Sequence, residues 1–461
     1  MLRGTTRIPP PPLPLRALDL FIIRNEKFLH KNLAGRDDRH RDADSRDKSA
    51  RRREECMSLR RTLGTLALAA STTLSSAALA QVPVKIGVLA DMSGIFSDIG
   101  GAGAAEATRM AVEDFAKLPE GKGLTVEVVA ADAQNKPDVS STIARKWFDS
   151  DGVDAVVDMP TSAISLALAP LVREKNKVAL FTASGSSDLT GKSCTPNSVH
   201  WTYDTWALAH GTAEAITKAG GKSWYFITAD FALGHALERD ASAVVKAEGG
   251  RVAGTVRHPT DAKDFSSFLL QAQASQAQVI GLTNAGGDTI NAIKQAAEFG
   301  IVQSGQQLAG MLLFLSDIHS LGLRTAQGLR LTTGFYWDLN AATRAFGERF
   351  AARNNGRYPT MNQAGAYSAT IAFLRAVAKV GSAKDGGAVV KAMREAGTFD
   401  DPLFGKTSLR ADGRVLHDMM LVEVKKPDES KKPYDYYKVL ATIPGPEAFR
   451  PLKDGGCPFV K

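Results

Sequence analysis

Residues 84–107 read Val-Lys-Ile-Gly-Val-Leu-Ala-Asp-Met-Ser-Gly-Ile-Phe-Ser-Asp-Ile-Gly-Gly-Ala-Gly-Ala-Ala-Glu-Ala, and this stretch decides the fold. Its first seven residues are mostly apolar and rich in β-branched side chains, which is typical of a buried strand. The Ser-, Gly- and Asp-rich residues that follow indicate a loop. Residues 104–116 then carry apolar side chains at helical spacing. Because α/β sheets bind ligands where a strand opens through a glycine loop into a helix, we predict a ligand-binding α/β protein.

The same strand–loop–helix unit recurs along the chain in two series. Helical patterns separate the apolar runs, so we expect parallel sheets with helices on both faces. Two similar series predict two Rossmann-like lobes. The predicted strands lie at 84–90, 124–129, 155–157 and 178–181 in the first series, and at 224–228, 251–256, 279–282 and 308–313 in the second.

The last third of the chain has a different pattern. It begins with helical stretches and ends with short runs typical of antiparallel strands, at 407–409, 419–424 and 436–441. The hydrophobic helix at 364–380 cannot extend the second sheet, so we expect it to pack back on the first lobe. The chain would then cross between the lobes more than once, with a cleft at the crossings and the short crossovers acting as a hinge.

The net charge of the 461-residue chain is +8, and this excess is unevenly spread. Residues 1–61 hold 16 Lys and Arg against 9 Asp and Glu, so the rest of the chain is close to neutral. A nucleic-acid-binding surface needs clustered positive charge on the folded part, and none is evident here. We therefore expect no nucleic-acid partner.

Residues 57–80 have the features of an export signal. Arg60 and Arg61 precede an apolar centre that ends in Ala78-Leu79-Ala80, so we predict cleavage before Gln81. The apolar part is too short to span a bilayer permanently. Residues 1–56, with a proline run and an Arg/Asp-rich tract, cannot bury a core. We interpret them either as the result of an incorrectly assigned translation start, with Met57 as the true start, or as a disordered extension.

Two cysteines, Cys194 and Cys457, lie in the predicted exported part. An even number of cysteines in an oxidising compartment favours a disulfide, and two buried free thiols are the alternative. No Cys/His cluster has the spacing of metal ligands, and we expect neither a metal site nor another cofactor.

At this point the chain resembles the periplasmic solute-binding proteins of branched-chain-amino-acid-type ABC importers, which have the type I periplasmic-binding fold. The order and spacing of short motifs carry this resemblance from about residue 84 to the C-terminus. The motifs are Ile86-Gly87-Val88-Leu89, Ser93-Gly94, Gly100-Gly101, Asp132, Thr161-Ser162, Thr182 to Ser186, Ala229 to Gly234, Lys263-Asp264-Phe265 and Asn284 to Asp288.

The resemblance implies two lobes joined by three crossovers. Lobe one would comprise 82–202 plus 334–415, and lobe two 203–333 plus 416–461. In this family, hydroxyls and backbone N–H groups on two lobe-one loops hold the ligand's carboxylate. The matching positions here are Thr161, Ser162, Ser184, Gly185 and Ser186. A helix start at Ser162 agrees with this role, because unpaired N–H groups there favour an anion. Helix capping and turn formation are the structural alternatives.

Lobe two is expected to close over the ligand with Tyr203, Phe231, Asn284 and Asp288. Phe96 or Ile99, depending on the register, stands where the family usually has a tyrosine in the first loop. Residues 310–315 are apolar throughout, whereas amino-acid-binding members carry a glutamate there for the ligand's ammonium group. A buried ammonium without a carboxylate partner is costly. We therefore expect an organic acid, in particular an aromatic one, ahead of a branched-chain amino acid. Asp288 could replace the glutamate, or could simply be a solvated helix residue.

The resemblance implies a periplasmic binding protein that delivers a small organic acid or amino acid to ABC permease subunits. We expect it to act as a monomer and to have no enzymatic activity. The six histidines after residue 81 are scattered, and no nucleophile–base–orienter set is evident. A ligand-sensing module of the same fold that signals to a receptor is the alternative, and a secreted serine hydrolase is a distant third.

Overall fold

The computed structural model describes residues 81–460, so the predicted extension and export signal lie outside the described residues. A first sheet has five parallel strands in the order β2-β1-β3-β4-β5. Ile86 and Val88 of β1 face a core shared with α2, whereas Leu89 faces a second core shared with α3 and α4. The elements are β1 (Val82–Ala90), α2 (Gly101–Phe115), β2 (Leu124–Asp132), α3 (Pro137–Asp149), β3 (Ala155–Asp158), α4 (Ser162–Glu174), β4 (Val178–Phe181) and β5 (Ser198–His200).

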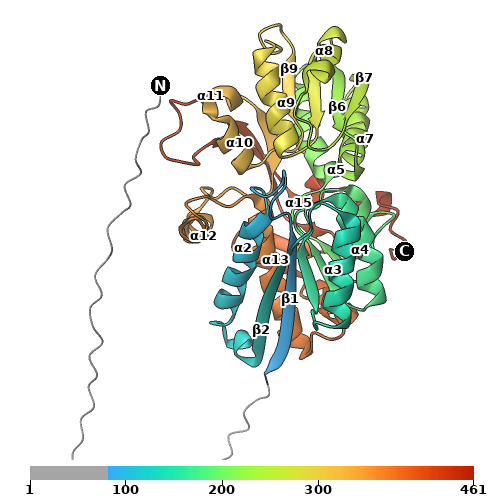
Figure 1. The fold of residues 1–461 in the computed structure, drawn as a ribbon, viewed down its shortest axis with the longest axis vertical. Coiled ribbons are helices and arrows are strands. Elements are labelled where there is room, and N and C mark those ends of the chain that lie inside the picture. The colour runs from blue at the N-terminus through green and yellow to red at the C-terminus, as the bar shows by residue number, and fades with distance from the viewer. Residues whose placement is uncertain (1–80, 461) are drawn as a thin grey trace, which may run out of the picture. The chain divides into compact units, whose positions relative to one another are not determined.

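A second sheet has four parallel strands in the order β7-β6-β8-β9. All five residues of β8 are buried, as expected for a central strand covered on both faces. The elements are β6 (Ser223–Ala229), α7 (Ala232–Ala247), β7 (Arg251–His258), α8 (Ser266–Ala274), β8 (Val279–Thr283), α9 (Gly287–Glu298) and β9 (Gln307–Gly310). Figure 1 shows the two sheets as separate groups, with β1 and β2 in blue to teal and β6 to β9 in green to yellow.

Each parallel sheet has a point where the strand order reverses. In the first sheet β1 lies between β2 and β3, and in the second β6 lies between β7 and β8. The loops that leave the two central strands therefore diverge from the loops of their neighbours. Such a divergence opens a crevice at the carboxyl ends of the strands, where α/β proteins bind ligands.

The last third of the chain is mixed, as the sequence predicts. Two small antiparallel sheets have the orders β10-β14-β15 and β11-β12-β13. The short strands β10 and β11 were not predicted, and the apolar strand predicted at 308–313 ends at Gly310 instead. The further elements are α5 (Thr205–Leu208), α6 (Glu214–Lys218), α10 (Leu315–Leu321), α11 (Leu323–Ala326), β10 (Arg330–Thr333), α12 (Ala341–Arg353), α13 (Met361–Val380), α14 (Gly386–Glu395), β11 (Thr398–Asp401), β12 (Gly405–Leu409), β13 (Val415–Leu416), β14 (Met419–Val424), β15 (Tyr437–Ile443) and α15 (Gly445–Ala448).

Helix α13 packs against α2 of the first sheet, as predicted for the hydrophobic helix of this region. The Gln363 side chain caps its start by accepting from the Thr360 backbone N–H at 3.0 Å. The side chains of these two residues bind the loop after β1. The Thr360 hydroxyl donates to the Ile99 carbonyl at 2.6 Å, and the Gln363 amide donates to the Gly100 carbonyl at 3.1 Å. The first turn of α13 is therefore held beside this loop.

The disulfide between Cys194 and Cys457 is present, as predicted, with a Cα–Cα distance of 5.7 Å. It joins the C-terminal tail to the segment between β4 and β5. Arg450 of the tail also donates to the Ser187 carbonyl at 2.9 Å. These contacts place the tail against the loop that follows β4. The lobe boundaries given above stay a prediction.

Candidate functional site

One cavity lies at the carboxyl ends of both parallel sheets. Its lining residues follow β1, β3 and β4 in the first sheet and β6, β8 and β9 in the second. The space between them is about 400 Å³, including the open mouth. Because this volume includes open solvent, the enclosed part is smaller and the cleft is narrow. It is lined by Phe96, Ile99, Gly100, Asp158, Pro160, Ser162, Ala183, Gly185, Tyr203, Phe231, Leu233, Ala285, Leu312, Phe314 and Asn362.

Four aromatic rings, those of Phe96, Tyr203, Phe231 and Phe314, contribute to this lining. The rings of Tyr203 and Phe314 meet edge to face, with centroids 5.9 Å apart. The Tyr203 hydroxyl donates to the Ala183 carbonyl at 2.7 Å, which fixes the ring against the loop after β4. Phe314 belongs to the apolar stretch 310–315, which also contributes Leu312 to the lining. The wall formed by this stretch is apolar, and no carboxylate replaces the family's glutamate there.

Ser162 presents hydrogen-bond donors to the cavity. It is the first residue of α4, where backbone N–H groups lack intrahelical partners and the helix dipole favours negative charge. Its hydroxyl oxygen accepts from the backbone N–H groups of Gly185 at 3.3 Å and Ser186 at 3.0 Å. The hydroxyl proton is therefore left to donate to a ligand. Uncharged donors at a helix start are suited to a carboxylate.

Five of the ten predicted ligand-binding residues line this cavity, namely Phe96, Ser162, Gly185, Tyr203 and Phe231. Three others hold the loops beside it. The Thr161 hydroxyl caps α4 by accepting from the Ile164 N–H at 3.3 Å. The Ser184 hydroxyl lies 2.8 Å from the Met159 carbonyl, and the Ser186 hydroxyl accepts from the Asp188 N–H at 3.3 Å.

The remaining two predicted residues, Asn284 and Asp288, lie buried behind the second sheet's loops and do not line the cavity. Asn284 binds the imidazole of His258 at 3.0 Å. Asp288 accepts from the backbone N–H groups of Asp261 at 3.2 Å and Ala262 at 2.9 Å. Burial raises the pKa of Asp288 to about 6, against the effect of these two bonds. Both carboxylate oxygens are thus occupied by the loop after β7.

Two polar residues that line the cavity were not predicted from the sequence. Asp158 ends β3 and is fully buried, and its carboxyl group accepts one long hydrogen bond of 3.4 Å from the Thr182 hydroxyl. Burial raises its pKa to about 7, the Thr182 bond opposes this rise, and the nearby Asp91 carboxylate adds to it. Asn362 lies in the first turn of α13 and is 2 % exposed. A polar residue at a strand end is a signal that could have found Asp158, whereas nothing local in the sequence identifies Asn362.

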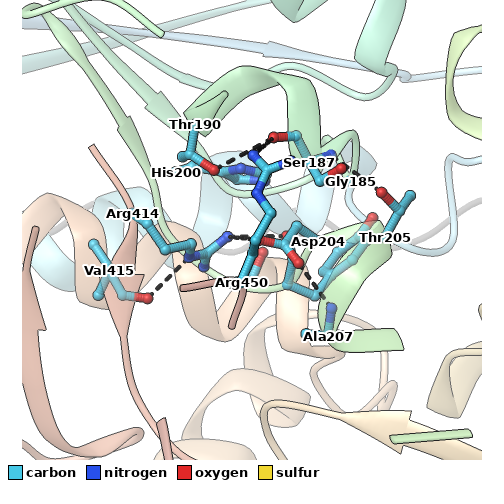
Figure 2. Close-up of polar contacts among 12 residues, drawn as sticks. Gly185, Ser187, Thr190, His200, Asp204, Thr205, Ala207, Arg414, Val415 and Arg450 are labelled. Carbon is cyan, nitrogen blue, oxygen red and sulfur yellow. Dashed lines mark hydrogen bonds and ion pairs between the residues drawn. The ribbon is translucent and has the colours of Figure 1, made fainter. Parts of the chain in front are cut away.

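A cluster of polar contacts surrounds Asp204, the residue that follows Tyr203 in the chain (Figure 2). The fully buried Arg414 guanidinium lies 3.5 Å from the Asp204 carboxylate and donates to the Val415 carbonyl at 3.0 Å. Burial lowers the pKa of Arg414 to about 10 and raises the pKa of Asp204. The Thr205 N–H donates to the Gly185 carbonyl at 2.7 Å. The segment at 203–205 is therefore joined to a cavity loop on one side and to β13 on the other.

None of the helices within residues 81–460 is long and apolar enough to cross a membrane. The same residues contain no group of three or more His, Cys, Asp or Glu side chains placed to hold a metal ion.

Comparison with solved structures gives clear relatives. A periplasmic binding protein from Burkholderia mallei is 49% identical, with a TM-score of 0.79, and the match covers 82% of this chain and 99% of that one. A branched-chain amino acid ABC transporter periplasmic ligand-binding protein from Burkholderia xenovorans is 41% identical, with a TM-score of 0.73 and the same coverage. A solute-binding protein of an ABC transporter from R. palustris, in complex with benzoate, is 20% identical, with a TM-score of 0.69 over 78% of this chain and 97% of that one, and shares the fold.

None of the curated proteins compared with the chain matches it. A sequence family described as periplasmic binding protein matches residues 83–431, which is most of the chain. The two parallel sheets with flanking helices agree with that family's type I fold. The predicted family and fold class are thereby confirmed, and members of this family bind substrates for transporters and are not enzymes. The chain belongs to the periplasmic binding proteins of ABC transporters.

Proposed function

We propose that this protein captures a small carboxylate-bearing solute in the cavity between its parallel sheets and delivers it to ABC permease subunits. The observation that carries the proposal is the position of Ser162, which begins α4 and lines the cavity. Its free hydroxyl proton and the adjacent helix N–H groups form a neutral anion site. The signal at 57–80 exports the chain, which acts in the periplasm as a monomer.

The lining supports an organic acid, and in particular an aromatic one, ahead of a branched-chain amino acid. Four aromatic rings surround a narrow space that suits a flat solute. The stretch 310–315 provides no carboxylate, and Asp288 lies outside the cavity with both oxygens bound. Asp158 does line the cavity, but burial disfavours its charged form by raising its pKa to about 7. A solute-binding protein of the same fold from R. palustris was solved in complex with benzoate, which supports this proposal.

Titration calorimetry tests the solute class. The purified protein is titrated with benzoate, 4-hydroxybenzoate, leucine and valine, and we expect an aromatic acid to bind most tightly. Tight binding of leucine without binding of any aromatic acid would refute the aromatic preference. Failure of every carboxylate to bind would refute the proposed function itself.

A variant tests the role of Ser162. Ser162→Ala removes the donor hydroxyl, and we expect the affinity for the bound acid to fall roughly 10-fold or more, as for a lost charge-assisted hydrogen bond. Ser267→Ala, at an exposed position on α8, is the matched control and should bind as the wild type does. Equal affinities of the two variants would place the carboxylate elsewhere.

A further inference from the structure

Two buried acceptor atoms that belong to lining residues of the cavity have no hydrogen-bond partner among residues 81–460. They are Oδ2 of Asp158, in a side chain that is fully buried, and Oδ1 of Asn362, in one that is 2 % exposed. Buried polar atoms in folded proteins are nearly always paired, so two such atoms in one cavity need an explanation. An unpaired acceptor in a binding cavity is satisfied when a ligand brings a donor.

The fold holds both atoms in place around Gly100. A Cβ atom at Gly100 would lie 3.0 Å from Oδ2 of Asp158, so the absence of a side chain at Gly100 leaves room for the carboxyl. Asn362 is held beside the same loop, because its neighbour Gln363 donates to the Gly100 carbonyl. Asp158 and Met159 both have left-handed backbone angles, with φ of 83° and 57°. Strained backbone of this kind is often retained at functional sites.

The protein itself offers no cation to this carboxyl within the cavity. None of the fifteen lining residues is Lys, Arg or His. The Thr182 hydroxyl reaches only Oδ1 of Asp158, and the nearby charged group is another carboxylate, that of Asp91. An isolated buried carboxyl is unfavourable unless something completes its hydrogen bonding. Residues 81–460 supply no such partner, and a bound solute that carries a donor would supply one.

We propose that the solute carries a hydrogen-bond donor, a hydroxyl or an ammonium group, in addition to its carboxylate, and that Asp158 and Asn362 accept it. This inference rests on the proposed function, since it takes the carboxylate to bind at Ser162. The cavity then offers donors at Ser162 and acceptors at Asp158 and Asn362. Among carboxylate solutes, one that carries such a donor is expected to bind more tightly than its donor-free analogue.

Matched solutes test the donor. The purified protein is titrated by calorimetry with 4-methylpentanoate, 2-hydroxy-4-methylpentanoate and leucine, and separately with benzoate and 4-hydroxybenzoate. Within at least one set, we expect the donor-bearing solute to bind roughly 10-fold or more tightly than its donor-free analogue, because that analogue leaves buried acceptors unpaired. Preference for the ammonium or the hydroxyl member identifies the donor.

Two variants at position 158 test the acceptor. Asp158→Gly removes the acceptor and tolerates the left-handed backbone, so we expect the preference for donor-bearing solutes to disappear. Asp158→Asn keeps an acceptor oxygen but removes the charge, so we expect a large loss of affinity for an ammonium solute and a small one for a hydroxyl solute. Asp401→Asn, which changes a buried carboxylate outside the cavity, should leave the preference unchanged.

The results separate the two proposals. If donor-free acids bind as tightly as their donor-bearing analogues, the inference about the donor is wrong while the proposed function stands. The inference is equally wrong if Asp158→Gly retains the full preference for donor-bearing solutes. If no carboxylate of either set binds, the proposed function is wrong and the inference fails with it.

Discussion

At the scale of single residues, the carboxyl of Asp158 links stability to pH. Burial raises its pKa to about 7 in the folded protein, well above the ordinary value of 3.8. An acid whose pKa is raised by folding lowers stability as pH rises from the unfolded to the folded pKa. The ligand-free protein is therefore expected to lose stability between about pH 4 and pH 7 through this group.

The substitution Asp158→Asn is expected to remove this loss of folding stability with rising pH. Asparagine has no charge to bury and tolerates a positive φ, so the folded backbone can be retained. We expect the ligand-free variant to be more stable than the wild type at pH 8 by roughly 2–4 kcal/mol, since one pKa unit corresponds to about 1.4 kcal/mol. Urea unfolding at pH 8 and at pH 4 measures this. The difference should largely vanish at pH 4, and a difference of equal size at both pH values would contradict the assignment to this carboxyl.

Some residues of the cavity could be predicted from the sequence, and others could not. Phe96, Ser162 and Phe231 follow apolar runs that can be read as strands, so their place at the carboxyl end of a sheet was predictable. Asp158 was missed although it directly follows the predicted strand at 155–157, a position typical of site residues. Asn362 comes about 200 residues later on a helix that is buried along most of its length. Only the tertiary packing of α13 brings it to the cavity.

At the scale of elements, strong local patterns predicted the two parallel series and the return of α13 to the first sheet. Short strands without such a pattern were missed, including β10 and β11, because a run of four residues carries little periodic signal. The partner of β10 is β14, about 90 residues away along the chain. Pairing over that separation is decided by tertiary contacts, which propensity alone does not encode.

The start of α13 can be tested as an element. Thr360→Ala removes the hydroxyl that donates to the Ile99 carbonyl and keeps the backbone N–H that Gln363 caps, so we expect a loss of about 1 kcal/mol in the free energy of unfolding. Because Ile99 lines the cavity, solute affinity should also fall several-fold. Denaturant unfolding and calorimetry measure the two effects.

A helix cap away from the cavity provides the control for this experiment. Asn340 caps α12 by accepting from the Ala342 and Thr343 N–H groups, and neither it nor α12 lines the cavity. Asn340→Ala should lose a similar amount of stability and keep full affinity. If both variants lose affinity equally, the effect comes from general destabilisation rather than from the loop at Ile99.

At the scale of the whole molecule, the cavity is shared between two sheets, so a solute that contacts both favours the closed arrangement over an open one. Gly185 lies at this junction. A Cβ atom there would come within 2.7 Å of the Tyr203 ring and 2.8 Å of Leu233, which follows β6 of the second sheet. Because the neighbouring groups are rings and branched side chains in a packed site, Gly185→Ala must push them apart.

We therefore expect Gly185→Ala to bind solute roughly 10-fold or more weakly and to resist closure. Small-angle X-ray scattering of the wild type should show a smaller radius of gyration with saturating solute, and the variant should show a smaller decrease or none. Gly123→Ala is the matched control, because a Cβ atom there meets nothing within 4 Å. Compaction of Gly185→Ala equal to that of the wild type, at matched occupancy, would mean that closure does not depend on the contact at this glycine.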